Sequence, residues 1–197
     1  MGLVSWFNPS LLRINANMRR LGAFNTFYRN HNELGNVPQE FYRWPLATEA
    51  AVAAGKTRLR LMDYIYSFLH QQHVDGTPAM WPLSWVHPTD ENTINIEHQF
   101  YFGPALLVSP VVAENATSAT FYVPNEVYYD FFDLSVVQGQ GAEITVDDVG
   151  YETMPLHIRG GSILPLRTGD ATPLNRIENC LSTSSSLPTR PTRLGVT

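Results

Sequence analysis

The sequence predicts an α+β chain in which the end of an α/β domain is followed by an antiparallel β-sandwich. Two observations concern the first part: residues 21–28 have the apolar and aromatic character of a buried strand, and residues 48–74 have helical periodicity. The third is a change of period, because the apolar runs after residue 78 are short, β-rich and separated by turn residues. We expect the boundary between the two parts near residues 76–82.

Composition excludes several classes of protein. The 197 residues carry a formal charge of −5 with no run of Lys or Arg, so we expect no nucleic-acid partner. No apolar run approaches the ~20 residues of a membrane helix, so we expect no membrane association. Cys180 is the single cysteine, which excludes an internal disulfide and a cysteine-based zinc site. We expect no metal and no cofactor.

The segment 21–33 changes character abruptly at its middle. Its apolar first half is followed by Arg29-Asn30-His31-Asn32, four polar side chains rich in hydrogen-bond donors. In a parallel α/β barrel, a buried strand delivers such side chains to the substrate at the C-terminal rim. The residues alone favour a plainer alternative, in which Arg29 and His31 form a structural ion pair or loop hydrogen bonds.

Residues 48–74 are the clearest helix in the sequence. Thr48 is a suitable N-cap, four alanines follow, and Gly76 precedes a proline that ends the helix. Gly55 is expected to mark a bend. His70 and His73 lie three residues apart, which suits a metal, but no third ligand is evident and a surface position is favoured. One apolar stripe is formed by Leu61, Ile65, Phe68 and Leu69.

The second half of the sequence reads as a series of strands. The β-rich runs cover residues 79–86, 99–102, 105–112, 120–123, 127–132, 143–146 and 154–158. After residue 167 the composition is rich in Ser, Thr and Pro, which predicts a disordered tail over 169–197. Asn115 stands in an Asn-Ala-Thr glycosylation sequon. Asp63 and Asp90 have no evident partner in the sequence.

Several blocks, in one order, resemble the C-terminal part of family 31 glycoside hydrolases, most closely the fungal secreted α-glucosidases (maltase type). They extend from about residue 21 to residue 167, roughly three quarters of the chain. The blocks are 21–24 (LGAF), 27–32 (FYRNHN), 38–44 (PQEFYRW), 58–66 (RLRLMDYIY), 99–103 (QFYFG), 105–111 (ALLVSPV), 128–130 (YYD) and 155–165 (PLHIRGGSILP).

The resemblance implies an α+β fragment made of the last strand and helix of a (β/α)8 TIM barrel followed by an antiparallel β-sandwich domain. The expected divisions are an unrelated N-terminal segment over 1–20, the last βα unit of the barrel over 21–77, the β-sandwich over 78–168 and the tail over 169–197.

The same resemblance implies a function and a site. Such enzymes hydrolyse terminal α-linked glucose by a retaining mechanism, with an α-glucoside or maltooligosaccharide as substrate. His31 is expected to bind sugar hydroxyls and Arg29 to brace the rim. The two catalytic aspartates lie on earlier barrel strands, and neither of their motifs is present in this sequence. We therefore expect no catalytic residue here and no hydrolysis by this chain alone.

Two alternatives stay open. In the first, the chain is a non-catalytic carbohydrate-binding β-sandwich in which Trp81, Trp85, Tyr128 or Tyr129 stacks on sugars. In the second, it is a subunit that completes a barrel supplied by a separate N-terminal portion. Packing of these four aromatic side chains in the sandwich core or at its contact with the barrel is favoured over stacking. The resemblance implies secretion, although residues 1–20 have no signal-peptide pattern.

Overall fold

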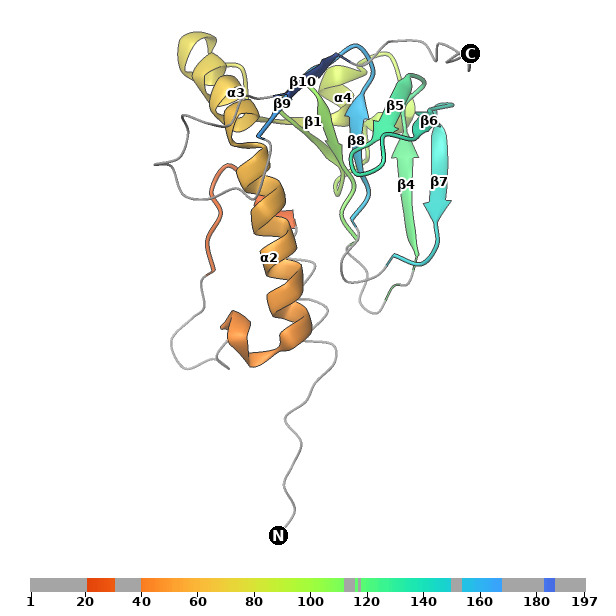
Figure 1. Ribbon diagram of the computed structural model, residues 1–197. Coiled ribbons are helices and arrows are strands. Elements are labelled where there is room, and N and C mark those ends of the chain that lie inside the picture. Colours follow the sequence, from red (N-terminus) through yellow and green to blue (C-terminus); the bar gives the residue numbers. More distant parts are fainter. Residues whose placement is uncertain are drawn as a thin grey trace, which may run out of the picture.

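A computed structural model describes residues 21–30, 40–111, 116, 118–149, 154–167 and 183–186. The two long helices cover one face of a six-stranded antiparallel sheet, and a two-stranded sheet covers the other face (Figure 1). The expected order, helical part first and antiparallel strands after it, is confirmed. No helix of the described residues is both long enough and apolar enough to cross a membrane.

The long helix predicted over 48–74 is two helices joined at Leu61. A 3-10 turn, η1 (Phe41–Arg43), precedes α2 (Pro45–Arg60), and α3 (Met62–Asp75) follows. The helix begins earlier than predicted because Pro45 suits the first turn, where no N–H is needed. Thr48 is therefore not the cap, and its hydroxyl instead donates to the Trp44 carbonyl at 3.1 Å. Gly76, in the left-handed conformation, ends α3 as expected.

The break at Leu61 has a cause outside the helix. The backbone N–H of Arg167 donates to the Arg60 carbonyl at 2.9 Å, which gives that carbonyl a partner from another segment. Interruption of the helical hydrogen-bond ladder is a common cause of a kink. Gly55, which the sequence predicted as the bend, lies inside α2.

The strand predicted over residues 21–28 is not formed. Residues 21–23 are helical and residues 24–27 form a turn and bends. The N–H of Phe24 donates to the Leu21 carbonyl and that of Asn25 to the Gly22 carbonyl, at 3.0 and 3.1 Å. A strand requires neighbouring strands to pair with, and the described residues place none beside this segment, so local hydrogen bonds form instead. The predicted burial holds for Ala23 and Phe24, which belong to the core.

The main sheet is antiparallel throughout, with the strand order β1-β2-β3-β8-β5-β6. Its strands are β1 (Met80–Pro82), β2 (Phe100–Phe102), β3 (Leu106–Val108), β8 (Leu156–Arg159), β5 (Val127–Asp130) and β6 (Val136–Gln138). The run predicted over 79–86 divides after Pro82, where the short helix α4 (Leu83–Val86) begins, and η2 (Glu91–Thr93) follows.

Two further pairs of strands complete the β part. The second sheet pairs β4 (Ala119–Val123) with β7 (Ala142–Val146), and the third pairs β9 (Ile163–Leu166) with β10 (Thr183–Ser186). β10 lies within the tail that the sequence predicts to be disordered. Its backbone pairs in register with β9, from Thr183 opposite Leu166 to Ser186 opposite Ile163.

The central strands are buried on both faces, and neighbouring residues contribute to different cores. Phe102 and Leu106 pack toward the helices, whereas Tyr101 and Leu107 pack toward the second sheet. Successive side chains of a strand point to opposite faces, so both cores draw on the same strands. This explains why the sequence runs are continuously apolar rather than alternating.

Tyr64 of α3 joins the helical part to the turn between β2 and β3. Its hydroxyl donates to the Phe102 carbonyl at 2.7 Å and accepts from the Ala105 N–H at 2.8 Å. Gly103 in this turn has φ +62°, and a Cβ there would lie 2.5 Å from the Phe68 ring. Glycine is required by both the conformation and the space. The helix is thereby fixed to the sheet at one turn.

A buried glutamine joins the two sheets on the other side. The Gln99 side chain accepts from the Tyr122 N–H at 2.8 Å and donates to the Tyr122 carbonyl at 2.9 Å. It also donates to the Ser109 hydroxyl at 2.9 Å. Gln99 is 4% exposed, and a buried amide needs hydrogen-bond partners inside the protein. These three hydrogen bonds supply them. Gln99 thus acts toward β4 as a neighbouring strand would.

Candidate functional site

The predicted sugar-binding segment is held in place by Arg58 of α2. The Arg58 guanidinium donates to the carbonyls of Ala23 and Asn25, both at 2.6 Å, and to that of Thr26 at 3.2 Å. It also lies over the Tyr28 ring, 5.6 Å from the centroid. Partial burial lowers the pKa of Arg58 from its ordinary value. The guanidinium remains charged, because the ordinary pKa of arginine lies far above neutral pH.

Of the two residues predicted to bind sugar, the structure describes Arg29. Arg29 follows the segment held by Arg58, and its side chain is exposed. His31 lies outside the described residues, as does Asn115, so the pairing of Arg29 with His31 and the glycosylation of Asn115 stay predictions. Arg29 is exposed and follows an apolar segment that Arg58 holds in place. This position is consistent with a role at a sugar-binding rim.

The two carboxylates that lacked partners in the sequence both have them in the structure. Asp63 accepts from Nη2 of Arg167 at 2.6 Å and from its Nε at 3.1 Å. Asp90 accepts from the Tyr122 hydroxyl at 2.5 Å. These hydrogen bonds lower the pKa of both carboxyl groups, so both are ionised at neutral pH. Their partners stabilise the fold, and sequence spacing gave no sign of either pair.

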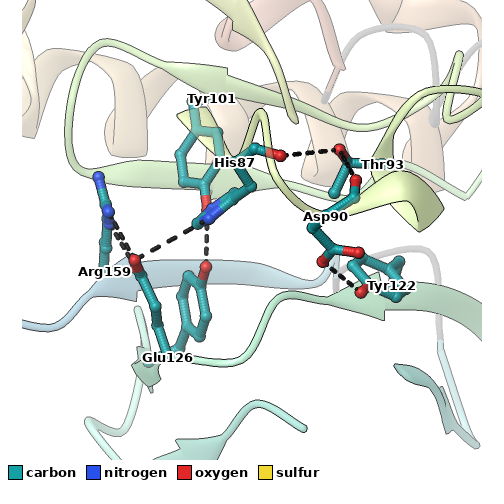
Figure 2. Close-up of polar contacts among 8 residues, drawn as sticks. His87, Asp90, Thr93, Tyr101, Tyr122, Glu126 and Arg159 are labelled. Carbon is teal, nitrogen blue, oxygen red and sulfur yellow. Dashed lines mark hydrogen bonds and ion pairs between the residues drawn. The ribbon is translucent and has the colours of Figure 1, made fainter. Parts of the chain in front are cut away.

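Figure 2 shows a polar cluster in the β part that the sequence did not predict. We call Glu126, Arg159, His87, Tyr101 and Tyr128 the Glu126 cluster. Nε and Nη2 of Arg159 donate to the two carboxylate oxygens of Glu126 at 2.5 and 2.6 Å. Nδ1 of His87 lies 3.9 Å from Glu126 Oε1, and its Nε2 lies 2.8 Å from the Tyr101 hydroxyl. The Tyr101 and Tyr128 hydroxyls are 2.6 Å apart.

The charges of the Glu126 cluster follow from burial and pairing. Burial opposes ionisation of Glu126, but the hydrogen bonds and charge of Arg159 outweigh it and the pKa of Glu126 is lowered. Its bond to Glu126 raises the pKa of Arg159. Burial lowers the pKa of His87 and raises the pKa of Tyr101 and Tyr128. At neutral pH the cluster therefore holds one ion pair and three neutral rings, and its tyrosines are not nucleophiles.

A cavity of about 940 Å³ opens beside the ion pair. Glu126 and Arg159 line it together with Asn125 and Ser162, and the Gly160–Gly161 turn forms part of its wall. The hydrogen-bond donors and acceptors that line the cavity suit a polar ligand. The cavity volume lies within the range typical of small-molecule sites. The sequence signals were Arg159 in the block at 155–165 and Glu126 in a turn, but nothing in the sequence places them together.

The aromatic residues proposed to stack on sugars are mostly in the core. Tyr128 is 0% and Tyr129 5% exposed, and Trp81 is partly buried against the core, where its indole N–H donates to the Pro78 carbonyl. Trp85 is 59% exposed. Packing is thus confirmed for both tyrosines, and Trp85 is the member of this group open to solvent. Among the described residues no cluster of three or more His, Cys, Asp or Glu side chains could hold a metal ion.

Two models of one family match this chain. Residues 7–68 match the glycosyl hydrolases family 31 TIM-barrel domain, and residues 76–164 match the glycosyl hydrolase family 31 C-terminal domain. Residues 69–75 lie between the two matched ranges, and the domain divisions drawn from the sequence stay predictions. The match to the barrel domain begins at residue 7, inside the segment 1–20 that we expected to be unrelated to the family. The expectation that segment 1–20 is unrelated to the family stays a prediction.

Curated relatives are fungal glucosidases. A protein of Aspergillus flavus described as "Probable alpha/beta-glucosidase agdC" is 48% identical over 151 residues, which are 77% of this chain and 17% of the relative. An uncharacterized family 31 glucosidase of Schizosaccharomyces pombe is 39% identical over 152 residues, 75% of this chain and 15% of the relative. The chain thus spans about a sixth of the length of the curated relatives it matches.

Solved structures of the family have the same fold. A GH31 dextranase of Flavobacterium johnsoniae, complexed with isomaltotriose, matches with TM-score 0.81 and 26% identity, over 90% of this chain and 22% of the dextranase. A glucosidase II alpha subunit matches with TM-score 0.75 and 31% identity, over 83% of this chain and 18% of that subunit. The chain belongs to glycosyl hydrolase family 31, and it carries part of the TIM-barrel domain together with the C-terminal domain.

Proposed function

We propose that this chain is the C-terminal part of an α-glucosidase that hydrolyses terminal α-linked glucose by a retaining mechanism. The observation that carries the proposal is the match of two consecutive family 31 domains in their expected order, with fungal relatives named as glucosidases. An α-glucoside or maltooligosaccharide is the proposed substrate. Secretion is proposed on the same basis, with Asn115 as a glycosylation acceptor.

Arg29 and His31 are the proposed sugar contacts. Arg58 holds the backbone just before them with three hydrogen bonds, which reduces the freedom of the rim before sugar binds. A pre-organised rim loses less conformational entropy on binding. His31 would then bind hydroxyls of the glucose unit, and Arg29 would support the same edge.

Cleavage itself requires groups that we did not find in this sequence. A retaining glycosidase uses two carboxyl groups about 5–5.5 Å apart, one as nucleophile and one as acid/base. Asp63, Asp90 and Glu126 are all engaged in hydrogen bonds that stabilise the fold. We therefore expect this chain alone to release no glucose, and we assign it no catalytic residue.

The proposed partner is the N-terminal portion of the barrel. Large apolar side chains of the helical part are exposed, among them Phe27 (73%), Tyr42 (80%) and Tyr66 (76%). Exposed apolar surface of this kind is typical of an interaction face. A barrel portion packing there would cover these side chains and supply the two carboxylates.

A complementation experiment tests this function. The N-terminal portion of the Aspergillus flavus relative, ending where the match to this chain begins, is expressed with and without this chain. Glucose release from maltose is expected only from the mixture, with neither part active alone. The proposal fails if the two parts copurify as a folded complex that releases no glucose. Activity of this chain alone would contradict the expected lack of catalytic carboxylates.

A further inference from the structure

The cavity beside the Glu126–Arg159 pair has polar groups that the fold does not use. Within the described residues, the side chains of Asn125 and Ser162 make no hydrogen bond, and Nη1 of Arg159 has no acceptor. The side chains of Arg159 and Glu126 are 30% and 34% exposed, so a ligand can reach them. The cavity therefore offers a carboxamide, a hydroxyl and a guanidinium N–H close to one another.

The charge balance of the cavity selects the class of ligand. Arg159 is already neutralised by two hydrogen bonds to Glu126, so an anion would have to compete with a carboxylate held at 2.5 and 2.6 Å. A cation would meet the same difficulty at Glu126. A neutral molecule with many hydroxyl groups can use the remaining donors and acceptors without breaking the pair.

An adjoining pocket adds an apolar wall. It has a volume of about 390 Å³, and its lining includes Trp81, which is partly exposed, in front of the buried residues Tyr64 and Phe68. Pro104 and Ile163 line both cavities, and Ile163 is 63% exposed, so the two cavities lie side by side at these residues. Aromatic and proline surfaces suit the C–H faces of a pyranose ring, because they bind apolar surface and leave its hydroxyls free.

We propose that these two cavities form one groove that binds a neutral saccharide chain of several sugar units. The polar cavity holds hydroxyls through Asn125, Ser162 and Arg159, while Ile163 and Trp81 contact ring faces. The groove lies on α3, β1, β8, β9 and the turns before β3 and β5, elements other than the segment carrying Arg29 and His31. This binding goes beyond the proposed hydrolysis, since it requires neither a carboxylate pair nor a completed barrel.

Calorimetric titration of the whole chain with maltoheptaose tests the groove. Measurable binding is expected, and replacing Asn125→Ala and Ser162→Ala together should weaken it at least about tenfold, because two polar contacts are lost. Asn95→Ala with Ser118→Ala is the matched control, since both residues are exposed and lie outside the two cavities. This control should bind as tightly as the unchanged chain.

Three results would overturn the groove. One is the absence of binding at about 10 mM maltoheptaose, a concentration at which even weak saccharide sites are partly filled. The second is loss of binding in His31→Ala with no loss in the Asn125/Ser162 variant, which would place the sugar at the rim instead. The third is competition by inorganic phosphate, which would show an anion site. None of these depends on glucose release, so the groove and the hydrolytic function can fail separately.

Discussion

Arg167 and Asp63, which lie 104 positions apart in the sequence, form an ion pair in which two guanidinium nitrogens contact one carboxylate. The same Arg167 donates its backbone N–H to the Arg60 carbonyl, at the break between α2 and α3. Arg167, the residue directly after β9, thus fixes both the position and the bend of the helical part. The fold of the first part of the chain depends on a residue near its end.

Replacing Arg167→Ala is expected to lower the free energy of unfolding by about 1 kcal/mol, since Asp63 is partly exposed and solvent weakens the pair. Urea unfolding followed by tryptophan fluorescence measures the change. Arg60→Ala removes an exposed guanidinium at the same break and should have a much smaller effect. Equal effects of the two substitutions would show that the ion pair with Asp63 does not stabilise the fold.

Replacing Tyr64→Phe removes a buried hydroxyl that serves both a carbonyl and an N–H of the β2–β3 turn. A loss of about 2–3 kcal/mol is expected because both groups would be buried without a partner. Tyr66→Phe is the control, since Tyr66 on the same helix is 76% exposed. Thermal unfolding of both variants provides the measurement, and a Tyr64→Phe protein as stable as the control would contradict the role of this hydroxyl.

Stability should decrease as the pH falls below about 6.5, the ordinary pKa of histidine. Burial lowers the pKa of His87 and His157 in the folded protein, although Asp130 opposes the shift at His157. The unfolded chain then binds protons that the folded protein excludes, so acid favours unfolding. Measured from about pH 7.5 to 5.5, the decrease in Tm should be reduced by about half in His157→Gln, because one of two contributions is removed. An unchanged slope would exclude His157 as a cause.

Replacing Arg58→Met should release residues 23–26 from α2, because the hydrogen bonds to their carbonyls and the guanidinium over the Tyr28 ring are lost while an apolar chain of similar length remains. Hydrogen exchange in this segment is expected to accelerate, because the carbonyls that Arg58 holds become free to move. Mass spectrometry of peptides from residues 21–30 detects the change. Protection equal to that of the unchanged chain would mean that core packing of Phe24 alone holds the rim.

Features that depend on neighbours in the sequence were predictable, and those that depend on distant contacts were not. Gly76 ended α3 as expected, and the apolar runs at 99–102 and 105–112 became β2 and β3, because conformation and burial are encoded locally. The break at Leu61 was unpredictable because it arises with Arg167. The segment 21–28 has the composition of a strand, but composition does not supply the neighbouring strand that it needs.

The candidate site divides in the same way. Arg29 and His31 are adjacent enough in sequence to be proposed together, and the family resemblance gave them a role. The Glu126 cluster combines His87, which follows α4, and Glu126, which precedes β5, with residues of β2, β5 and β8. Only the folded sheet brings them together. Gln99 and its bonds to Tyr122 were likewise hidden, since the sequence shows only a polar residue before a strand.

Residues 21–167 are proposed to provide the sugar-binding rim and the C-terminal domain of an α-glucosidase. We would replace the matching segment of an active fungal relative with these residues and measure kcat/KM for maltose. The chimera is expected to be active. In it, His31→Ala should lower kcat/KM by about 100-fold or more through loss of a sugar contact, whereas Asn95→Ala should leave it unchanged. A folded, active chimera in which His31→Ala is as fast as the unchanged chimera would contradict this proposal.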